Sequence, residues 1–289
     1  MSVRIFAPAK INLTLKVGRP RVDGLHPLQS VVMFADVGDV VEAAPGERLS
    51  LTVTGEFAEG LSAVEDNLVI RAAHALAAAA GIEKPGASLS LEKNLPIASG
   101  IGGGSSDAAA TLRALNALWE LNLPIARLVE IARQLGSDVP VCVAAETAFM
   151  TGSGESSQSI SALPFAAVLV NPLIPLPTAN VYRQFDRMGL GAELSPGAPP
   201  HWSNPDAALR EIAALGNDLE PAARALLPEL DDIAALMRKD GRVRHAGLSG
   251  SGATMFALMQ KAEHAEVLAE IWQRAHPDWW VADTILGAA

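Results

Sequence analysis

Glycine and hydroxyl residues are crowded into one short stretch of the chain, residues 96–107 (PIASGIGGGSSD). The stretch holds four glycines and three serines. A glycine-rich turn lets successive backbone N–H groups point toward one position, and the start of a following helix adds the positive end of its dipole. This backbone suits a phosphate group. We therefore predict anion binding by Pro96, Ile97, Ala98, Ser99, Gly100, Ile101, Gly102, Gly103, Gly104, Ser105 and Ser106.

The kind of phosphate ligand follows from two motifs that the sequence lacks. No Gly-Lys-Ser or Gly-Lys-Thr occurs, which excludes a Walker A loop. The third glycine position of a dinucleotide-binding fingerprint is occupied by Ser105. A nucleoside triphosphate is therefore the favoured ligand, and a plain strand-to-helix turn is the structural alternative.

The elements that must position this stretch can be read from hydrophobic periodicity. Alternating residues predict a strand over 87–91, and apolar residues spaced by three and four predict a helix over 108–119. Ser105, Ser106 and Asp107 stand where the N-cap of that helix is expected. A second alternation, over 10–17, places Lys10 and Asn12 on the strand face opposite the apolar one.

The rest of the chain has the pattern of a mixed α/β protein. Strands are predicted over 37–41, 49–53, 148–150 and 166–170, and helices over 68–80, 125–135, 207–215, 221–227 and 230–239. Residues 172–205 are rich in proline and glycine, which predicts a surface loop. The residue pattern of the C-terminal part predicts a strand, a helix and a strand, together with a second glycine-rich turn at 247–252.

Charge and composition narrow the possible function. The 289 residues include 22 Lys and Arg against 32 Asp and Glu, a formal net charge of −10, whereas nucleic-acid and anionic membrane surfaces attract basic faces. The single cysteine excludes an internal disulfide, no apolar run reaches the roughly 20 residues of a membrane helix, and the first residues lack a signal-peptide core. The histidines and the cysteine do not show the spacing of zinc ligands, which argues against a zinc site. We expect a cytoplasmic protein that binds neither nucleic acid nor membranes.

Three segments in this order resemble motifs of the GHMP kinases, the superfamily of galactokinase and of homoserine, mevalonate and phosphomevalonate kinases. They are residues 8–13 (PAKINL), the glycine-serine stretch 96–107, and residues 247–254 (GLSGSGAT). The resemblance implies a two-domain α/β fold. Residues 1–158 would form the ATP-binding N-terminal domain, similar to ribosomal S5 domain 2, and residues 159–289 a ferredoxin-like C-terminal domain. It leaves open whether the protein is a monomer or a homodimer.

Further segments resemble the members of this superfamily that act on a cytidine-diphosphate sugar alcohol. They are residues 23–30 (DGLHPLQS), 65–69 (EDNLV), 135–140 (LGSDVP) and 216–220 (GNDLE). The resemblance implies ATP-dependent phosphorylation of the 2-hydroxyl group of cytidylylated methylerythritol, in the non-mevalonate isoprenoid pathway. The products would be the 2-phosphate and ADP, and Mg²⁺ would arrive with ATP.

The resemblance also assigns the catalytic and adenine-binding residues. Asp138 would orient the attacking hydroxyl and accept its proton, and Lys10 would neighbour it and stabilise charge on the transferred group. Taken alone, Asp138 also fits a helix cap before Pro140, and Lys10 also fits a solvated strand lysine. Asn67 and Leu68 would flank the adenine, although Asn67 also fits a helix start.

The acceptor substrate would be held by Asn12, Leu25, His26, Thr178, Tyr182, Gly250 and Ser251. Leu25 departs from the family pattern, which usually has an aromatic residue there to stack on cytosine; Tyr182 would supply the other ring. Leucine keeps an apolar contact but loses one ring stack, worth about 1 kcal/mol at most. For the turn containing Gly250 and Ser251, a simple strand hairpin is the alternative.

Two other functions remain open from the sequence. One is a GHMP kinase for a different alcohol, against which residues 23–30 argue because a cytidine pocket explains them. The other is a non-catalytic nucleotide-binding regulator on the same scaffold, against which the presence of both Lys10 and Asp138 argues.

Overall fold

The computed structural model describes residues 1–59, 61, 66–161, 163–195 and 197–287, so Glu65 of the 65–69 segment lies outside the described residues. The chain divides into two compact units that are interleaved in sequence. The first contains Met1–Ala9, Val37–Ile97 and Gly102–Ala145, and the second contains Lys10–Asp36, Ala98–Ile101 and Glu146–Ala289. Strands β1 (Val3–Asn12) and β3 (Leu28–Ala44) therefore contribute residues to both units.

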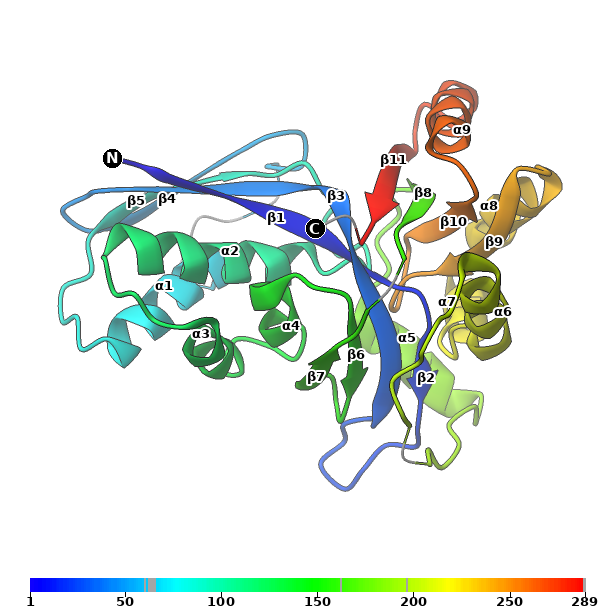
Figure 1. The fold of residues 1–289 in the computed structure, drawn as a ribbon, viewed down its shortest axis with the longest axis horizontal. Helices are drawn as coiled ribbons and strands as arrows, with labels where there is room; N and C mark the ends of the chain where they lie inside the picture. The colour runs from blue at the N-terminus through cyan, green and yellow to red at the C-terminus, as the bar shows by residue number, and fades with distance from the viewer. Residues whose placement is uncertain (60, 62–65, 162, 196, 288–289) are drawn as a thin grey trace. The chain divides into compact units, whose positions relative to one another are not determined.

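The first unit packs helices on one side of a sheet, as Figure 1 shows. Strand β4 (Leu49–Thr54) pairs in parallel with β5 (Ala87–Glu92), and β5 pairs antiparallel with the end of β3, while β1 also pairs with β3. The helices are α1 (Leu68–Ala79), α2 (Gly103–Leu118), α3 (Ile125–Ala132) and α4 (Val139–Ala144). Along β5 buried residues alternate with more exposed ones, so one face of the strand contributes Leu89 and Leu91 to the core.

The second unit contains an antiparallel sheet in the order β11, β8, β10, β9. These strands are β8 (Phe165–Asn171), β9 (Val243–Leu248), β10 (Met255–Met259) and β11 (Trp280–Leu286). The unit also holds the short strands β2 (Lys16–Val17), β6 (Ala148–Thr151) and β7 (Ser156–Ser159). Its helices are α5 (Thr178–Arg187), α6 (Pro205–Leu215), α7 (Glu220–Leu226), α8 (Glu229–Lys239) and α9 (Ala262–Ala275). Its core includes Val168 on β8, Phe185 on α5 and Met237 on α8.

Most predicted elements are confirmed, and their ends have local causes. Helix α1 starts at its N-cap Asn67, whose side chain accepts a hydrogen bond from the Val69 N–H, and it is followed by Gly81 at φ +69°. Pro140 lies in the first turn of α4, as predicted. No helix among the described residues is both long and apolar enough to cross a bilayer.

Four local predictions are wrong. Helix α2 begins earlier than predicted, with Gly102 as N-cap, so Ser105, Ser106 and Asp107 lie inside the helix. The predicted strand over 10–17 is interrupted between β1 and β2. The predicted loop over 172–205 contains α5, whose Val181 and Phe185 are buried one helical turn apart. The C-terminal part has two strands, β9 and β10, before α9 and β11.

Candidate active site

The start of α2 leaves backbone amides available for an anion. Ser106 N–H donates to the Gly102 carbonyl at 2.9 Å, the first hydrogen bond of the helical ladder. The N–H groups of Gly103, Gly104 and Ser105 lie before Ser106 in the first turn of the helix. They therefore have no helical carbonyl four residues earlier that could accept from them. Gly104 is exposed. This geometry fits the predicted phosphate loop, whereas the Ser106 hydroxyl is used structurally and donates to the Pro8 carbonyl at 2.7 Å.

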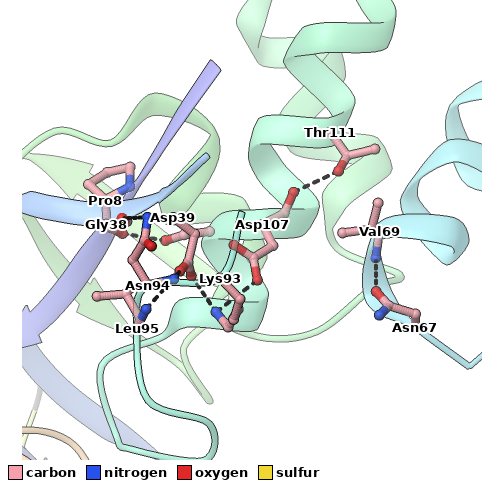
Figure 2. Close-up of polar contacts among 11 residues, drawn as sticks. Pro8, Gly38, Asp39, Asn67, Val69, Lys93, Asn94, Leu95, Asp107 and Thr111 are labelled. Atoms are coloured by element: carbon pink, nitrogen blue, oxygen red, sulfur yellow. Dashed lines mark hydrogen bonds and ion pairs between the residues drawn. The ribbon is translucent and has the colours of Figure 1, made fainter. Parts of the chain in front are cut away.

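The start of α1 lies against the start of α2 within the first unit. The Asn67 side-chain oxygen caps α1 through the Val69 N–H at 2.9 Å, as Figure 2 shows. A methyl group added at Gly104 would stand 3.5 Å from Leu68 Cδ1. The helix-start interpretation of Asn67 is thus confirmed. The predicted adenine role of Asn67 and Leu68 is compatible with their place beside the phosphate loop and stays a prediction.

Asp138 directly precedes α4, but its side chain makes no capping hydrogen bond to that helix. Its backbone is already helical, with φ −86° and ψ −19°. An N-cap normally has an extended backbone and an oxygen that accepts from the first turn. Asp138 therefore occupies the N-cap position of α4 without a side-chain capping bond, and its catalytic role stays a prediction.

Parts of three sequence motifs meet within the second unit. The Lys10 N–H donates to the Ile101 carbonyl at 2.8 Å, and the Thr254 N–H donates to the Ser99 carbonyl at 3.0 Å. Ser249 connects the same segments, since its hydroxyl accepts from the Asn12 N–H at 3.1 Å and donates to the Gly100 carbonyl at 3.0 Å. Segments nearly 240 residues apart in sequence are thereby held in one backbone assembly.

Close backbone contact explains why glycine occupies two of these positions. A methyl group at Gly100 would stand 2.6 Å from the carbonyl oxygens of both Ser249 and Gly252, and φ at Gly100 is +76°. A methyl group at Gly250 would stand 2.8 Å from the Gly100 carbonyl oxygen. The turn 249–254 joins the antiparallel strands β9 and β10, so the hairpin interpretation of this turn is confirmed.

Lys10 and Asn12 are buried rather than on a solvent-facing strand surface, with 3% and 5% of their surface exposed. The solvated-lysine alternative is therefore wrong. The Asn12 side-chain N–H donates to Ser30 Oγ at 2.7 Å. The Asn12 side-chain oxygen is buried without a hydrogen-bond partner in the described part of the chain. It lies 3.4 Å from the position that a methyl group on Gly250 would occupy. A buried acceptor of this kind is costly unless an ordered water molecule or a ligand donates to it.

The predicted acceptor-binding residues of the second unit fall into two groups. The hydroxyls of Thr178 and Ser251 are 2.9 Å apart. The His26 ring lies 4.9 Å from the Tyr182 ring between centroids, and its Nδ1 is 2.9 Å from the Gly18 carbonyl oxygen. Because a carbonyl only accepts, that Nδ1 carries the proton. Leu25 is 53% exposed.

Comparisons with known proteins agree with these motifs. The family models for the GHMP kinase N-terminal domain and the GHMP kinase C-terminal domain match residues 67–146 and 201–278. A 4-diphosphocytidyl-2-C-methyl-D-erythritol kinase of Hyphomonas neptunium is 47% identical over 98% of this chain and 96% of its own length. The chain belongs to the GHMP kinases.

Two further relatives cover almost the whole of this GHMP kinase. A protein of the same name from Parvibaculum lavamentivorans is 47% identical over 97% of each chain. A crystal structure of 4-(cytidine 5′-diphospho)-2C-methyl-D-erythritol kinase is 33% identical and superposes with a TM-score of 0.79, covering 99% of this chain and 100% of that one. The predicted two-domain GHMP kinase fold is thereby confirmed.

Asn217 is a residue of this kinase that reasoning from the sequence missed. Its side-chain N–H groups donate to the Leu248 and Gly250 carbonyls, both at 2.8 Å, and its oxygen accepts from the Leu219 N–H at 2.9 Å. Asp218 next to it accepts from the Val17 N–H at 2.9 Å and pairs with Lys16. The segment 216–220 thus supports the turn that carries Gly250 and Ser251. The resemblance of that segment to the family was visible in the sequence, but the carbonyls it binds were not.

Proposed function

We propose that this kinase transfers the γ-phosphoryl group of ATP to the 2-hydroxyl group of 4-diphosphocytidyl-2-C-methyl-D-erythritol, giving the 2-phosphate and ADP in the non-mevalonate isoprenoid pathway. The observation that carries the proposal is the 47% identity, over 98% of the chain, to a relative of that name. The buried Asn12 oxygen, held beside the 249–254 turn, supports an acceptor that offers a hydroxyl group.

The transfer asks for positioning and charge stabilisation more than for covalent chemistry by the protein. The acceptor oxygen bonds to the γ-phosphorus as the bond from that phosphorus to the β–γ bridging oxygen breaks, and ADP leaves. The Asp138 carboxylate accepts the hydroxyl proton. The Lys10 ammonium stabilises negative charge on the transferred group.

Nucleotide binding is assigned to the loop 96–106 together with Asn67 and Leu68. The amides at the start of α2 donate to the phosphates, and the first turn of α1 flanks the adenine. Mg²⁺ belongs to the nucleotide substrate, since phosphate oxygens and water supply most of its ligands in such sites.

Acceptor binding is assigned to residues of the second unit. The Asn12 oxygen accepts from a substrate hydroxyl, and the turn with Gly250 and Ser251 packs on the substrate beside Thr178. His26 and Tyr182 bind the cytosine. Leu25 adds an apolar contact in place of a second aromatic ring, which lowers the affinity for cytidine by one stacking interaction.

A coupled assay of ADP release tests the function. ADP should form only when ATP, Mg²⁺ and the cytidylylated methylerythritol are all present. Asp138→Asn removes the proton acceptor but keeps the size of the side chain, so we expect kcat to fall by about 10²–10⁴-fold with the KM for ATP within about twofold. Asp278→Asn, at an exposed position, is the matched control.

Two results would overturn the assignment. If Asp138→Asn turned over like the control, Asp138 would not be the proton acceptor. If mevalonate or homoserine were phosphorylated faster than the cytidylylated substrate, the kinase would act on a different alcohol.

A further inference from the structure

The ionisable side chains of Lys93, Asp39 and Asp107 meet close to the residues that flank the glycine-rich loop, as Figure 2 shows. Lys93 follows β5, Asp39 lies on β3 and Asp107 lies on α2, and their side chains are 4%, 0% and 4% exposed. The Lys93 ammonium donates to the Asp39 carboxylate and, at 3.1 Å, to the Asp107 carboxylate. Burying ionisable groups is costly unless they are paired or neutral, so a buried cluster of three such side chains calls for an explanation.

The cluster connects the chain before the loop with the helix after it. The other oxygen of Asp39 accepts from the backbone N–H groups of Asn94 at 2.6 Å and Leu95 at 2.8 Å, the residues that lead into the loop. On the far side of the loop, a methyl group at Gly103 would stand 3.0 Å from Lys93 Nζ. The ammonium therefore lies against the first residue of α2, where the backbone amides are available for phosphate.

The protonation of Asp107 decides the net charge of this cluster. Burial raises the pKa of Asp107; Lys93 opposes the rise and Asp39 adds to it, which brings the pKa to about 8. Burial lowers the pKa of Lys93, but the two carboxylates raise it overall. The raised pKa favours the protonated form of Asp107 at neutral pH, which gives a cluster of an ammonium, a carboxylate and a carboxylic acid without net charge. The second Asp107 oxygen, buried without a hydrogen-bond partner among the described residues, is also better tolerated on a neutral group.

Most other ionisable side chains on α2 and on the helices packed against it are exposed. Helix α2 packs against α1, α3 and α4. The ionisable side chains on α2 and these helices, apart from Asp107, are the exposed Arg71, His74, Arg127 and Glu130, the half-buried Arg113 and the buried Cys142. The charges that act most strongly on Asp107 are those of Lys93 and Asp39.

We propose that Lys93, Asp39 and Asp107 are positioning residues that hold the two ends of the glycine-rich loop in the geometry that binds the nucleotide phosphates. The inference rests on the proposed ATP binding by that loop. The Lys93 ammonium lies against Gly103 and attracts a phosphate anion bound at the start of α2. A neutral Asp107 leaves the cluster without a net negative charge that would repel this anion. Deprotonation of Asp107 adds that negative charge, so ATP binding weakens as the pH rises through the pKa of Asp107.

Asp107→Asn tests the proposal, because asparagine has the shape of the neutral acid and does not titrate. For the unmodified kinase we expect the KM for ATP to rise about fivefold or more between about pH 7 and about pH 9.5, with the acceptor KM unchanged. In Asp107→Asn the KM for ATP should stay within about twofold over that range. Asp278→Asn should keep the rise.

Lys93→Met gives a second, independent readout. It keeps the apolar stem but removes the ammonium that pairs with the Asp39 carboxylate and lies against Gly103, so the KM for ATP should rise about tenfold or more at pH 7 while the acceptor KM stays within about twofold. Should this variant fail to fold, the Asp107→Asn pH profile still decides.

Stability against pH supplies a control on the Asp107 protonation state. Its folded pKa lies above the unfolded value of 3.8, so the folded protein binds the extra proton and the free energy of unfolding falls as the pH rises from about 4 to about 8. Asp107→Asn should remove this part of the slope in urea unfolding. The proposal is overturned if the unmodified kinase is active and Asp107→Asn keeps the alkaline rise in the KM for ATP. Absence of any acceptor-dependent ADP release by the unmodified kinase would instead reject the proposed function.

Discussion

At the scale of single residues, the buried polar side chains are concentrated in the segments that carry the motifs. Burying a polar group is costly, so such a concentration marks positions with a structural or chemical task. The buried polar residues of the three GHMP motifs are Lys10, Asn12, Ser99, Ser106, Asp107, Ser249, Ser251 and Thr254. The same criterion finds Lys93 and Asp39, which lie outside these motifs.

Asn217 allows a prediction at this scale. Asn217→Ala removes three hydrogen bonds and leaves the Leu248 and Gly250 carbonyls without these donors. We expect the free energy of unfolding to fall by about 2–3 kcal/mol, since each such bond contributes about 1 kcal/mol net. Urea unfolding measures the change. Asn180→Ala, at an exposed position of α5, should change it by less than about 0.5 kcal/mol, and equal losses in both variants would contradict the role of Asn217.

At the scale of elements, much of the predicted site is formed by turns at the ends of helices and strands. The start of α2, the start of α1 and the β9–β10 turn supply backbone groups rather than long side chains. Backbone groups are positioned by the elements they belong to, so rigid helices and strands make these positions reproducible. Gly100 is an example of a glycine required by close backbone contact, because a side chain there would collide with the carbonyl oxygens of the 249–254 turn.

Gly100 and Gly81 have similar φ angles, so alanine substitutions at both positions distinguish the free-energy cost of the left-handed backbone from that of steric contact. Gly100 has φ +76° and is enclosed by the carbonyls of Ser249 and Gly252, whereas Gly81 has φ +69° and open space around a methyl group. Gly81→Ala should cost about 1–2 kcal/mol of stability for the left-handed backbone alone. Gly100→Ala should cost about 2 kcal/mol more, because two carbonyls must move.

Chemical unfolding and steady-state kinetics check this pair. Gly100→Ala should also raise the KM for ATP and the KM for the acceptor, because Gly100 belongs to the predicted nucleotide-binding loop and touches the 249–254 turn, while Gly81→Ala should leave both KM values unchanged. Equal stability losses in the two variants would mean that the 249–254 turn moves away from the 98–101 segment easily.

At the scale of the whole molecule, the two compact units share the motifs between them. The first unit holds Asp138, Asn67, Leu68 and the start of α2, and the second holds Lys10, Asn12 and the 249–254 turn. Each unit is built from segments distant in the sequence. Cutting the chain at any single position therefore could not yield the two units as separate continuous fragments.

Nucleotide binding should be measurable as a property of the whole molecule. A ligand that binds only the folded state stabilises it, by about 2.7 kcal/mol at one hundred times its dissociation constant. We expect MgATP without acceptor to raise the unfolding temperature, and excess EDTA to remove at least about half of that shift by taking away Mg²⁺. An unfolding temperature that does not respond to MgATP would contradict ATP binding by the folded kinase.

The sequence by itself determined most of the regular elements, the family and the candidate residues, but not α5 or the start of α2. Asn67 before an apolar-periodic run, and Gly81 after it, define α1 because capping and periodicity are local properties. The three motifs were recognisable because their residue types and order are written in the chain. The predicted catalytic roles of Lys10 and Asp138 remain predictions from that resemblance.

Only the tertiary structure decided which partners the polar residues have. Ser105, Ser106 and Asp107 resembled N-caps in the sequence, yet they lie inside α2, where Ser106 donates to the Pro8 carbonyl and Asp107 pairs with Lys93. Asn12 is tied to Ser249, 237 residues away. Such partners are chosen by packing, because a buried polar group must find whatever donor or acceptor the fold brings to it, and no local pattern in the sequence carries that information.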